Sequence, residues 1–234
     1  MKKLSIIIPC FNESKTIGKI LKKILNQKYI KKQIIIVDDN SSDNSLEIIK
    51  KYSKNIDKII LHKKNKGKGA CIISAKKYIK GDAVIIQDGD LEYDPKDYKK
   101  LYDPIFKKQY KVVYGSRVLG KKFNRIKKNF DLPNIRVLGN FILTKISNII
   151  NNQSLTDAHT CYKVFDSELF KSLKLKENDF AFCPEVTSLI SKKKIKIFEV
   201  PISYKGRSVA EGKKIKFRDA IRALQVLLKT NVLK

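Results

Sequence analysis

The segment LSIIIPCFNE at residues 4–13 decides the fold, because an apolar run passes there directly into a polar cluster. The same change occurs at residues 34–43, IIIVDDNSSD, and at residues 83–92, AVIIQDGDLE. Short, continuous apolar runs are typical of strands that are covered on both faces. Each of the three segments therefore predicts a buried strand that ends in polar side chains.

Amphipathic segments alternate with strands through the first half of the chain. Residues 15–27 place Ile17, Ile20, Leu21 and Ile24 at the 3–4 spacing of a helix. Further strands are expected at residues 58–61 and 112–114, and further helices at residues 45–52, 68–79 and 97–107. Alternating strands and helices predict parallel crossovers. The expected fold class is α/β, with a Rossmann-like, mostly parallel sheet flanked by helices.

The second half is expected to be less regular. Residues 116–134 are polar and basic and predict a loop, and residues 154–165 are rich in turn-forming residues. The remaining expected elements are helices at residues 135–150, 182–193 and 215–229 and a strand at residues 195–200. With no internal repeat and no clear linker, residues 1–234 are expected to form one domain.

The composition favours a globular protein with a strongly basic surface. Hydrophobic residues make up 42% of the 234, which excludes wholesale disorder, and the net charge is +28. Only six of the 51 basic residues are arginine, and the lysines are spread along the chain. A merely solvated surface and attraction to polyanions both remain open. The four cysteines lack C-x-x-C spacing, which favours free thiols in a reducing compartment.

No targeting or membrane-spanning segment is expected. The first apolar run is too short for a signal peptide, and no run approaches the ~18 apolar residues of a membrane span. The expected location is cytoplasmic, peripheral on the inner face of a membrane. The last helix is of a kind that can lie on an anionic bilayer, because Phe217, Ile221, Leu224 and Leu228 follow 3–4 spacing beside a mostly basic stripe. Packing of this helix on the domain is the equally compatible alternative.

Three polar clusters converge on one rim, because the carboxyl ends of parallel strands form the ligand-binding edge of an open α/β sheet. Alternation along residues 88–92 would aim Asp88, Asp90 and Glu92 to one side. Gathered carboxylates need a compensating cation, and hard oxygen ligands favour Mg²⁺ or Mn²⁺, completed by a substrate phosphate. A solvated Asp-Gly-Asp turn is the alternative, which three clusters on the same edge disfavour.

The three clusters, with GSR at 115–117 and YKGRSVAEGKK at 204–214, resemble family 2 glycosyltransferases with the GT-A fold. The most similar branch is the polyprenyl-phosphate sugar synthases, such as the dolichyl-phosphate mannose synthases. The resemblance implies a nucleotide-sugar half at about residues 1–115, an acceptor half at about 116–234, and a C-terminal amphipathic helix at about 215–230.

The resemblance also implies roles for individual residues. The nucleotide sugar is assigned to Pro9, Asn12, Glu13, Asp38, Asp39, Asp88 and Gly89, and the metal to Asp88, Asp90 and Glu92. The acceptor phosphate is assigned to Ser116, Arg117, Arg136, Lys163, Arg207, Lys213 and Lys214, and catalysis to Asp90, Arg117 and Asp157. The segment from Asp157 to Lys163 departs from the family pattern, with Cys161 in place of Gly and Lys163 in place of Arg.

The implied function is metal-dependent, inverting transfer of a hexose from GDP-mannose or UDP-glucose to a polyprenyl or dolichyl phosphate. A phosphate monoester is an anion near neutral pH and needs no general base, whereas a hydroxyl acceptor does. Arg117 and Arg207 suit such an acceptor, because Arg binds phosphate bidentately. A saccharide or other soluble acceptor in cell-surface polysaccharide synthesis is the alternative.

The expected partners are a nucleotide sugar, a polyprenyl phosphate and a membrane surface, with room for a membrane-protein partner. Nucleic acid is not expected, because the lysines are diffuse and the acidic rim would repel phosphates without a metal. A catalytically inactive relative that serves as a scaffold is disfavoured by the intact Asp88, Asp90, Arg117 and Arg207.

Overall fold

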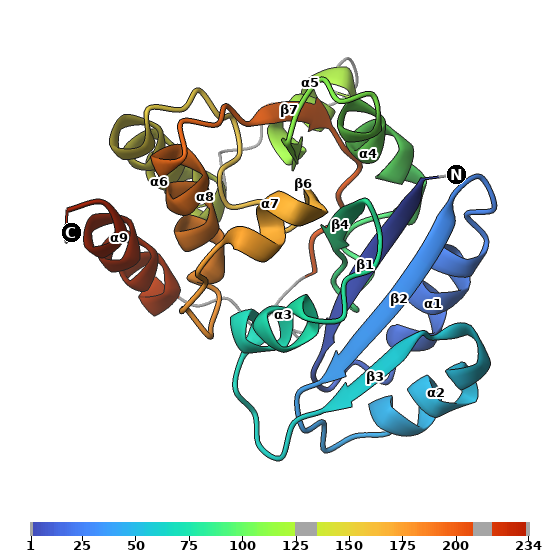
Figure 1. Ribbon diagram of the computed structural model, residues 1–234. Helices are drawn as coiled ribbons and strands as arrows, with labels where there is room; N and C mark the ends of the chain where they lie inside the picture. Colours follow the sequence, from blue (N-terminus) through green and yellow to red (C-terminus); the bar gives the residue numbers. More distant parts are fainter. Residues whose placement is uncertain (1, 125–134, 208–216, 233–234) are drawn as a thin grey trace.

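The computed structural model describes the backbone of residues 2–124, 135–207 and 217–232 (Figure 1). Within these residues seven strands form one sheet in the order β3-β2-β1-β4-β6-β5-β7. The strands are β1 (Lys3–Cys10), β2 (Lys31–Asp38), β3 (Lys58–Leu61), β4 (Ala83–Ile86), β5 (Val112–Ser116), β6 (Lys163–Asp166) and β7 (Phe198–Pro201). Only β6 runs antiparallel to its described neighbours, β4 and β5. The expected mostly parallel sheet is therefore confirmed.

Helices cover both faces of the sheet (Figure 1). They are α1 (Ile17–Leu25), α2 (Ser45–Lys51), α3 (Lys68–Lys76), α4 (Tyr98–Phe106), α5 (Arg117–Asn124), α6 (Ile135–Asn151), α7 (Ser167–Ser172), α8 (Phe182–Lys192) and α9 (Phe217–Val232). Short 3₁₀ turns lie at Ser53–Asn55 and Pro95–Asp97. No described helix is both long and apolar enough to cross a membrane.

The core consists of two layers, one on each side of the sheet. Leu4, Ile6 and Ile8 of β1 pack with α1, α2 and α4, whereas Ile7 faces the opposite layer, which contains side chains of α3, α7 and α8. Successive side chains of a strand point to opposite faces, so the unbroken Ile run of β1 supplies both layers.

Three elements differ from the expectation for the second half. The predicted loop at residues 116–134 begins with a helix, α5, and the turn-rich segment at 154–165 ends in β6, which α7 follows directly. These elements have few residues, so their periodicity is weak, and a local helix cap and strand pairing hold them instead. The backbone N–H of Leu119 donates to Ser116 Oγ at 3.1 Å, and β6 pairs on both sides.

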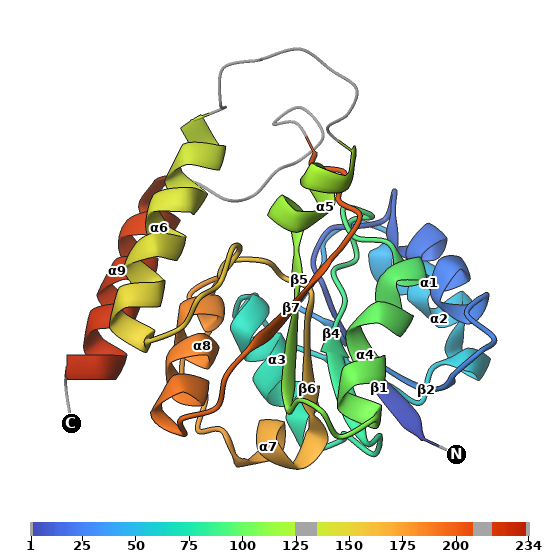
Figure 2. The ribbon, with the colours of Figure 1, turned by 90° about the horizontal axis from the view of Figure 1, so that it is seen from above.

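Helices α6 and α9 lie side by side at one edge of the molecule, and both pack against α8 (Figure 2). This pair stands outside the two core layers. The predicted divisions of the chain, one domain with a nucleotide half and an acceptor half, stay predictions.

Gly69 permits a close approach between α3 and the loop before α8. A Cβ at Gly69 would lie 2.1 Å from the carbonyl oxygen of Glu177, and the N–H of Ala70 donates to the carbonyl of Asn178 at 3.0 Å. We expect Gly69→Ala to lower the free energy of unfolding by about 1–3 kcal/mol, because backbone must move to admit the methyl group. Urea denaturation measures this change.

Gly139→Ala is the matched control, since Gly139 is also helical and a Cβ there meets nothing within 4 Å. Alanine is the better helix former, so this variant should be unchanged or stabilised by up to about 1 kcal/mol. Equal stability changes in the two variants would contradict the close approach at Gly69.

Candidate active site

The polar clusters after β1 and β2 are joined into one rim. The register of the two parallel strands places Cys10 beside Asp38. Beyond the strands, Asn12 Oδ1 accepts from the N–H of Ser42 at 2.8 Å, and Ser45 Oγ accepts from the N–H of Glu13 at 2.8 Å. Asn12 takes a left-handed conformation with φ of 52°. The two loops therefore hold each other at the carboxyl edge of the sheet.

Asp38 and Asp39 have different surroundings although they are neighbours in sequence. Asp38 Oδ2 accepts from the N–H of Ser41 at 3.1 Å, whereas Oδ1 is buried and has no hydrogen-bond partner within the described chain. Buried acceptors are normally satisfied, so an unpartnered one at a sheet edge is a candidate ligand contact.

Asp39 supports the loop that leads into α3. Its carboxylate accepts from His62 Nδ1 at 2.6 Å, from the N–H of Lys66 at 2.9 Å and from the N–H of Gly67 at 2.7 Å. Asp39, His62 and Cys71 lie close enough together to hold a metal ion. However, His62 Nε2 also bonds Ser74 Oγ at 2.9 Å, so both imidazole nitrogens are used internally. We read this cluster as structural.

The segment after β4 brings carboxylates against two cations. Asp88 forms an ion pair with Lys68, and Asp90 Oδ2 accepts from an Arg207 N–H at 2.8 Å. Arg207 also pairs with Glu13 at 3.2 Å, and its backbone N–H donates to Glu92 Oε1 at 2.8 Å. The side chains predicted as metal ligands thus lie together, with an arginine and a lysine as their counterions.

Burial of this cluster and repulsion among its carboxylates shift the pKa of Asp90. The pKa of Asp90 is raised to about 7, first because the carboxyl is buried and then because Asp88 and Glu92 are negative neighbours. Arg207 acts in the opposite direction and favours the ionised form. Such a cluster is suited to a further cation, since an added positive charge relieves repulsion between the carboxylates.

Gly89 lies between the two loops, where a Cβ would be in ordinary contact with Glu13 and Ile17, at 3.6 and 3.5 Å. Pro9 is half-buried within β1, just before the rim. Gly89 and Pro9 therefore belong to the backbone of the rim, and neither has an ionisable side chain.

A second charged centre joins Arg117 to Asp157. Arg117 Nε and Nη2 donate to the two carboxylate oxygens at 2.6 and 2.7 Å, and Asn140 Nδ2 of α6 donates to Oδ1 at 3.2 Å. Burial alone would raise the pKa of Asp157, but Arg117 and the hydrogen bonds outweigh burial and lower it. Asp157 is therefore a persistent anion that orients Arg117, which makes it a weak candidate for a general base.

Two residues assigned to the acceptor phosphate, Ser116 and Lys163, are buried and bonded within the protein. Ser116 Oγ bonds Thr156 Oγ1 at 2.6 Å. The ammonium of Lys163 donates to the carbonyls of Ala158 and Thr160 at 2.9 and 2.6 Å and lies over the ring of Tyr114. Neither side chain is exposed, so neither offers its polar atoms to a ligand in this conformation.

The other acceptor assignments lie partly outside the described residues. Lys213 and Lys214 are not described, and Arg136 is described only by its backbone in α6. Arg117 is part-exposed and pairs with Asp157, whereas Arg207 lies within the carboxylate cluster and pairs with Glu13 and Asp90. The two arginines thus pair with different carboxylates.

Sequence reasoning missed several residues of these centres. Lys68 had no signal beyond its two flanking glycines, and Asn140 none at all. Tyr204 donates to Glu92 at 2.9 Å, and the guanidinium of Arg117 lies over the Tyr204 ring, 5.1 Å from its centre. His159 has a buried, unpartnered Nε2, and its pKa is lowered to about 4, first by burial and then by Lys163.

Known proteins match the chain in both sequence and fold. The pattern of glycosyl transferase family 2 matches residues 5–174. The UDP-N-acetylglucosamine–dolichyl-phosphate N-acetylglucosaminyltransferase of Methanococcus voltae is 30% identical, over 90% of this chain and 90% of its own. The dolichol-phosphate mannosyltransferase of Pyrococcus furiosus is 28% identical, over 91% of this chain and 60% of its own.

Among solved structures, a glucosyl-3-phosphoglycerate synthase from Mycobacterium tuberculosis in complex with Mn²⁺, UDP and phosphoglyceric acid superposes with a TM-score of 0.72. It is 14% identical, and the match covers all of this chain and 80% of that one. The fold is thus that of the GT-A glycosyltransferases.

The fold and the matched pattern define the chain as a transferase with the GT-A fold and an acidic rim at the carboxyl edge of its sheet. The chain belongs to glycosyltransferase family 2. It is a glycosyltransferase that resembles the polyprenyl-phosphate sugar synthases.

Proposed function

We propose that the protein transfers a hexosyl group from a nucleotide sugar to a polyprenyl phosphate. The observation that carries this proposal is the carboxylate cluster of Asp88, Asp90 and Glu92 on the sheet edge, held by Lys68 and Arg207. A diphosphate leaving group requires positive charge at this edge, and the same cluster can exchange its counterions for a metal. The printed names of the relatives support a lipid-phosphate acceptor.

The donor site is proposed to lie over the first two strands and the glycine of the acidic segment. Asp38 Oδ1 is the unpartnered acceptor there, and it can accept from a nucleoside N–H or O–H. Asn12 and Glu13 shape the adjoining loop, next to Pro9 and Gly89. Asp39 takes part indirectly, because it fixes the loop of residues 62–67.

Mg²⁺ or Mn²⁺ fits the same rim. Asp88, Asp90 and Glu92 would hold the ion, because they supply the hard oxygen atoms that these cations prefer. The raised pKa of Asp90 and the two cations already paired with the cluster fit a centre built for positive charge. When bound, the ion would stabilise the negative charge of the departing nucleoside diphosphate.

The acceptor is proposed to bind at the Arg117 centre. Asp157 and Asn140 hold the guanidinium in place, so Arg117 can orient a phosphate without losing its own geometry. The acceptor oxygen attacks the anomeric carbon of the donor sugar, the bond from that carbon to the diphosphate breaks, and the diphosphate leaves with the electron pair. A phosphate oxygen is already an anion, so no described residue has to remove a proton.

The experiment that tests this proposal is transfer of labelled sugar into an organic phase. Purified protein with Mg²⁺ and a polyprenyl phosphate is supplied in parallel with GDP-mannose, UDP-glucose or UDP-N-acetylglucosamine. Label in the lipid fraction with one donor supports the proposal and identifies the donor. Label only in a soluble saccharide acceptor would favour the alternative function in polysaccharide synthesis.

Arg207→Ala is expected to tighten binding of Mn²⁺ with UDP by about tenfold while lowering sugar transfer. Arg207 neutralises Glu13, Asp90 and Glu92, so it competes with a metal for these oxygens. Isothermal titration of Mn²⁺ and UDP measures the affinity. Arg222→Ala is the matched control, because Arg222 pairs with the carboxylates of Glu177 and Asp179 elsewhere. Weaker metal binding in Arg207→Ala would show that Arg207 supports the metal site and does not compete for it.

A further inference from the structure

Helix α6 carries large apolar side chains on its outer side. Val137, Leu138, Phe141, Ile142 and Ile149 are all exposed, Phe141 to 55% and Ile149 to 82%. They are one, three, four or seven residues apart, and these spacings place them on one side of a helix. These five residues are called the α6 stripe below.

The most buried side chains of α6 are polar. Thr144, Ser147 and Asn151 are buried, and each has a partner. The N–H of Ala158 donates to Thr144 Oγ1 at 3.3 Å, and Asn151 bonds Ser147 at 3.1 Å and Asn231 of α9 at 3.2 Å. A helix packed on a soluble core has the reverse arrangement. These hydrogen bonds fix the polar side chains of α6 against the protein, so its apolar stripe faces outward.

The surroundings of the stripe are cationic. Lys145 is exposed between Ile142 and Ile149, and residues 135–151 contain no acidic residue. On the neighbouring helix α9, the helical spacing places exposed Ile221 and Leu228 on the same side as exposed Arg218 and Lys229. An apolar stripe with basic neighbours matches a membrane surface of anionic lipid. A second copy is a poor occupant, because each chain carries a net charge of +28.

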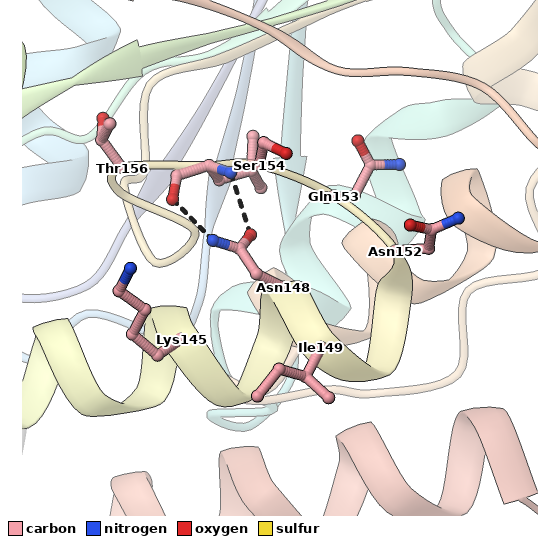
Figure 3. A pocket seen from close by; sticks show the side chains of 8 residues that line it. Lys145, Asn148, Ile149, Asn152, Gln153, Ser154 and Thr156 are labelled. Carbon is pink, nitrogen blue, oxygen red and sulfur yellow. Dashed lines mark hydrogen bonds between the residues drawn. The ribbon is translucent and has the colours of Figure 1, made fainter.

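A polar pocket adjoins the stripe (Figure 3). It is lined by the last turns of α6 and by the loop of residues 152–156. Lys145 and Ile149 belong to both the outer side of α6 and the pocket, and the Lys145 side chain extends toward that loop (Figure 3). The pocket thus places the Lys145 amine beside amide and hydroxyl groups and next to exposed Ile149. This arrangement fits a lipid headgroup whose acyl chain lies along the stripe.

We propose that the α6 stripe is the surface by which the protein docks on an anionic bilayer. This inference deepens the proposed function, because the same helix serves both the bilayer and the acceptor centre. Phe141 points outward, whereas the preceding residue, Asn140, donates to Asp157, the partner of Arg117. Docking through α6 therefore holds Arg117 near the depth at which a lipid phosphate lies. Helix α9 adds the exposed basic residues Arg218 and Lys229 at the rim of this surface, while its Val226 and Leu227 are buried against the protein.

Flotation of the full chain with lipid vesicles tests the docking surface. Vesicles of phosphatidylglycerol and phosphatidylcholine are compared with vesicles of phosphatidylcholine alone, without any polyprenyl phosphate. Phe141→Ser is expected to weaken binding to the anionic vesicles about tenfold, because it removes a large apolar group from the bilayer interface. Leu61→Ser is the matched control, since Leu61 on β3 is also 55% exposed, and it should bind as the wild type does.

Unchanged binding of Phe141→Ser would overturn the proposal, and so would an equal loss in Leu61→Ser. Sedimentation velocity without vesicles tests whether a second copy of the chain occupies the stripe. A wild-type dimer that Phe141→Ser dissociates would assign the stripe to that second copy. The melting temperature of each variant shows that a loss of binding is not unfolding. Sugar transfer to a short-chain, soluble prenyl phosphate is measured in parallel. Transfer without vesicle binding would refute the docking surface alone, whereas vesicle binding without transfer would refute the proposed function alone.

Discussion

Asp90→Asn is expected to lower the rate of sugar transfer at least about a hundredfold, as the loss of one preorganised charge-stabilising group does in other enzymes. Asp90 lies between Asp88 and Glu92 in the sequence, and its half-buried carboxylate pairs with Arg207 at 2.8 Å. The measurement is the initial rate of label transfer at saturating donor and acceptor. Glu168→Gln is the control, because its carboxylate side chain is 84% exposed and pairs only with Lys171 among the described residues.

The same variant should remain folded. Burial and negative neighbours disfavour the charge of Asp90, so the neutral amide is expected to leave the melting temperature unchanged or slightly raised. A lost rate with retained stability separates a functional role from a structural one. Turnover close to that of the wild type would instead remove Asp90 from the proposed metal site.

Asp157→Ala is expected to have the largest effect on stability, lowering the free energy of unfolding by about 3–5 kcal/mol. The side chain of Asp157 is fully buried, and that of Arg117 is 20% exposed, so the variant strands a guanidinium that has lost its bidentate partner. At ~2–4 °C per kcal/mol for a domain of this size, the melting temperature should fall by roughly 6–20 °C. Scanning calorimetry or thermal circular dichroism measures the fall.

Replacing both partners tests the cause of that loss. The double variant Arg117→Met with Asp157→Leu should recover a large part of the stability, because no buried charge is left without a partner. Glu168→Ala, which breaks the exposed pair with Lys171, should change stability by no more than about 1 kcal/mol. If the double variant were less stable than Asp157→Ala, the stranded charge would not be the reason for the loss.

The first half of the fold was predictable because its signals are local. The isoleucine runs of residues 6–8 and 34–36 become β1 and β2, and the stripe from Ile17 to Ile24 becomes the buried face of α1. The polar residues after each strand meet at one edge because parallel strands end on the same side. The carboxylate cluster was therefore predictable as a cluster.

The counterions and the second half depended on long-range contacts. Lys68 reaches Asp88 from the start of α3, and Arg207 reaches Asp90 across 117 positions of sequence. The motif assigned Arg207, Ser116 and Lys163 to an acceptor phosphate, yet Arg207 lies in the acidic cluster and the other two are buried. A motif gives the type and order of residues but not which side chain is buried.

Helix α6 shows the same limit, because its buried side chains are polar and its large apolar side chains are exposed. Its apolar residues predict a helix correctly, but periodicity alone cannot say which side faces the core. The buried Thr144 and Asn151 decide this, because their hydrogen bonds fix the polar side inward. For the last helix the sequence leaves both a membrane contact and packing on the domain open, and the structure buries Val226 and Leu227 while Ile221 and Leu228 stay exposed.

The proposed acceptor is a phosphate that Arg117 orients and that needs no general base. The most direct measurement compares label transfer from the preferred nucleotide sugar to a polyprenyl phosphate and to the polyprenol that lacks the phosphate. We predict transfer to the phosphate and none to the alcohol, because Arg117 lowers the pKa of Asp157 and so disfavours removal of a hydroxyl proton by this carboxylate. Equal transfer to both lipids would contradict a phosphate nucleophile and would require a base that the proposed mechanism does not contain.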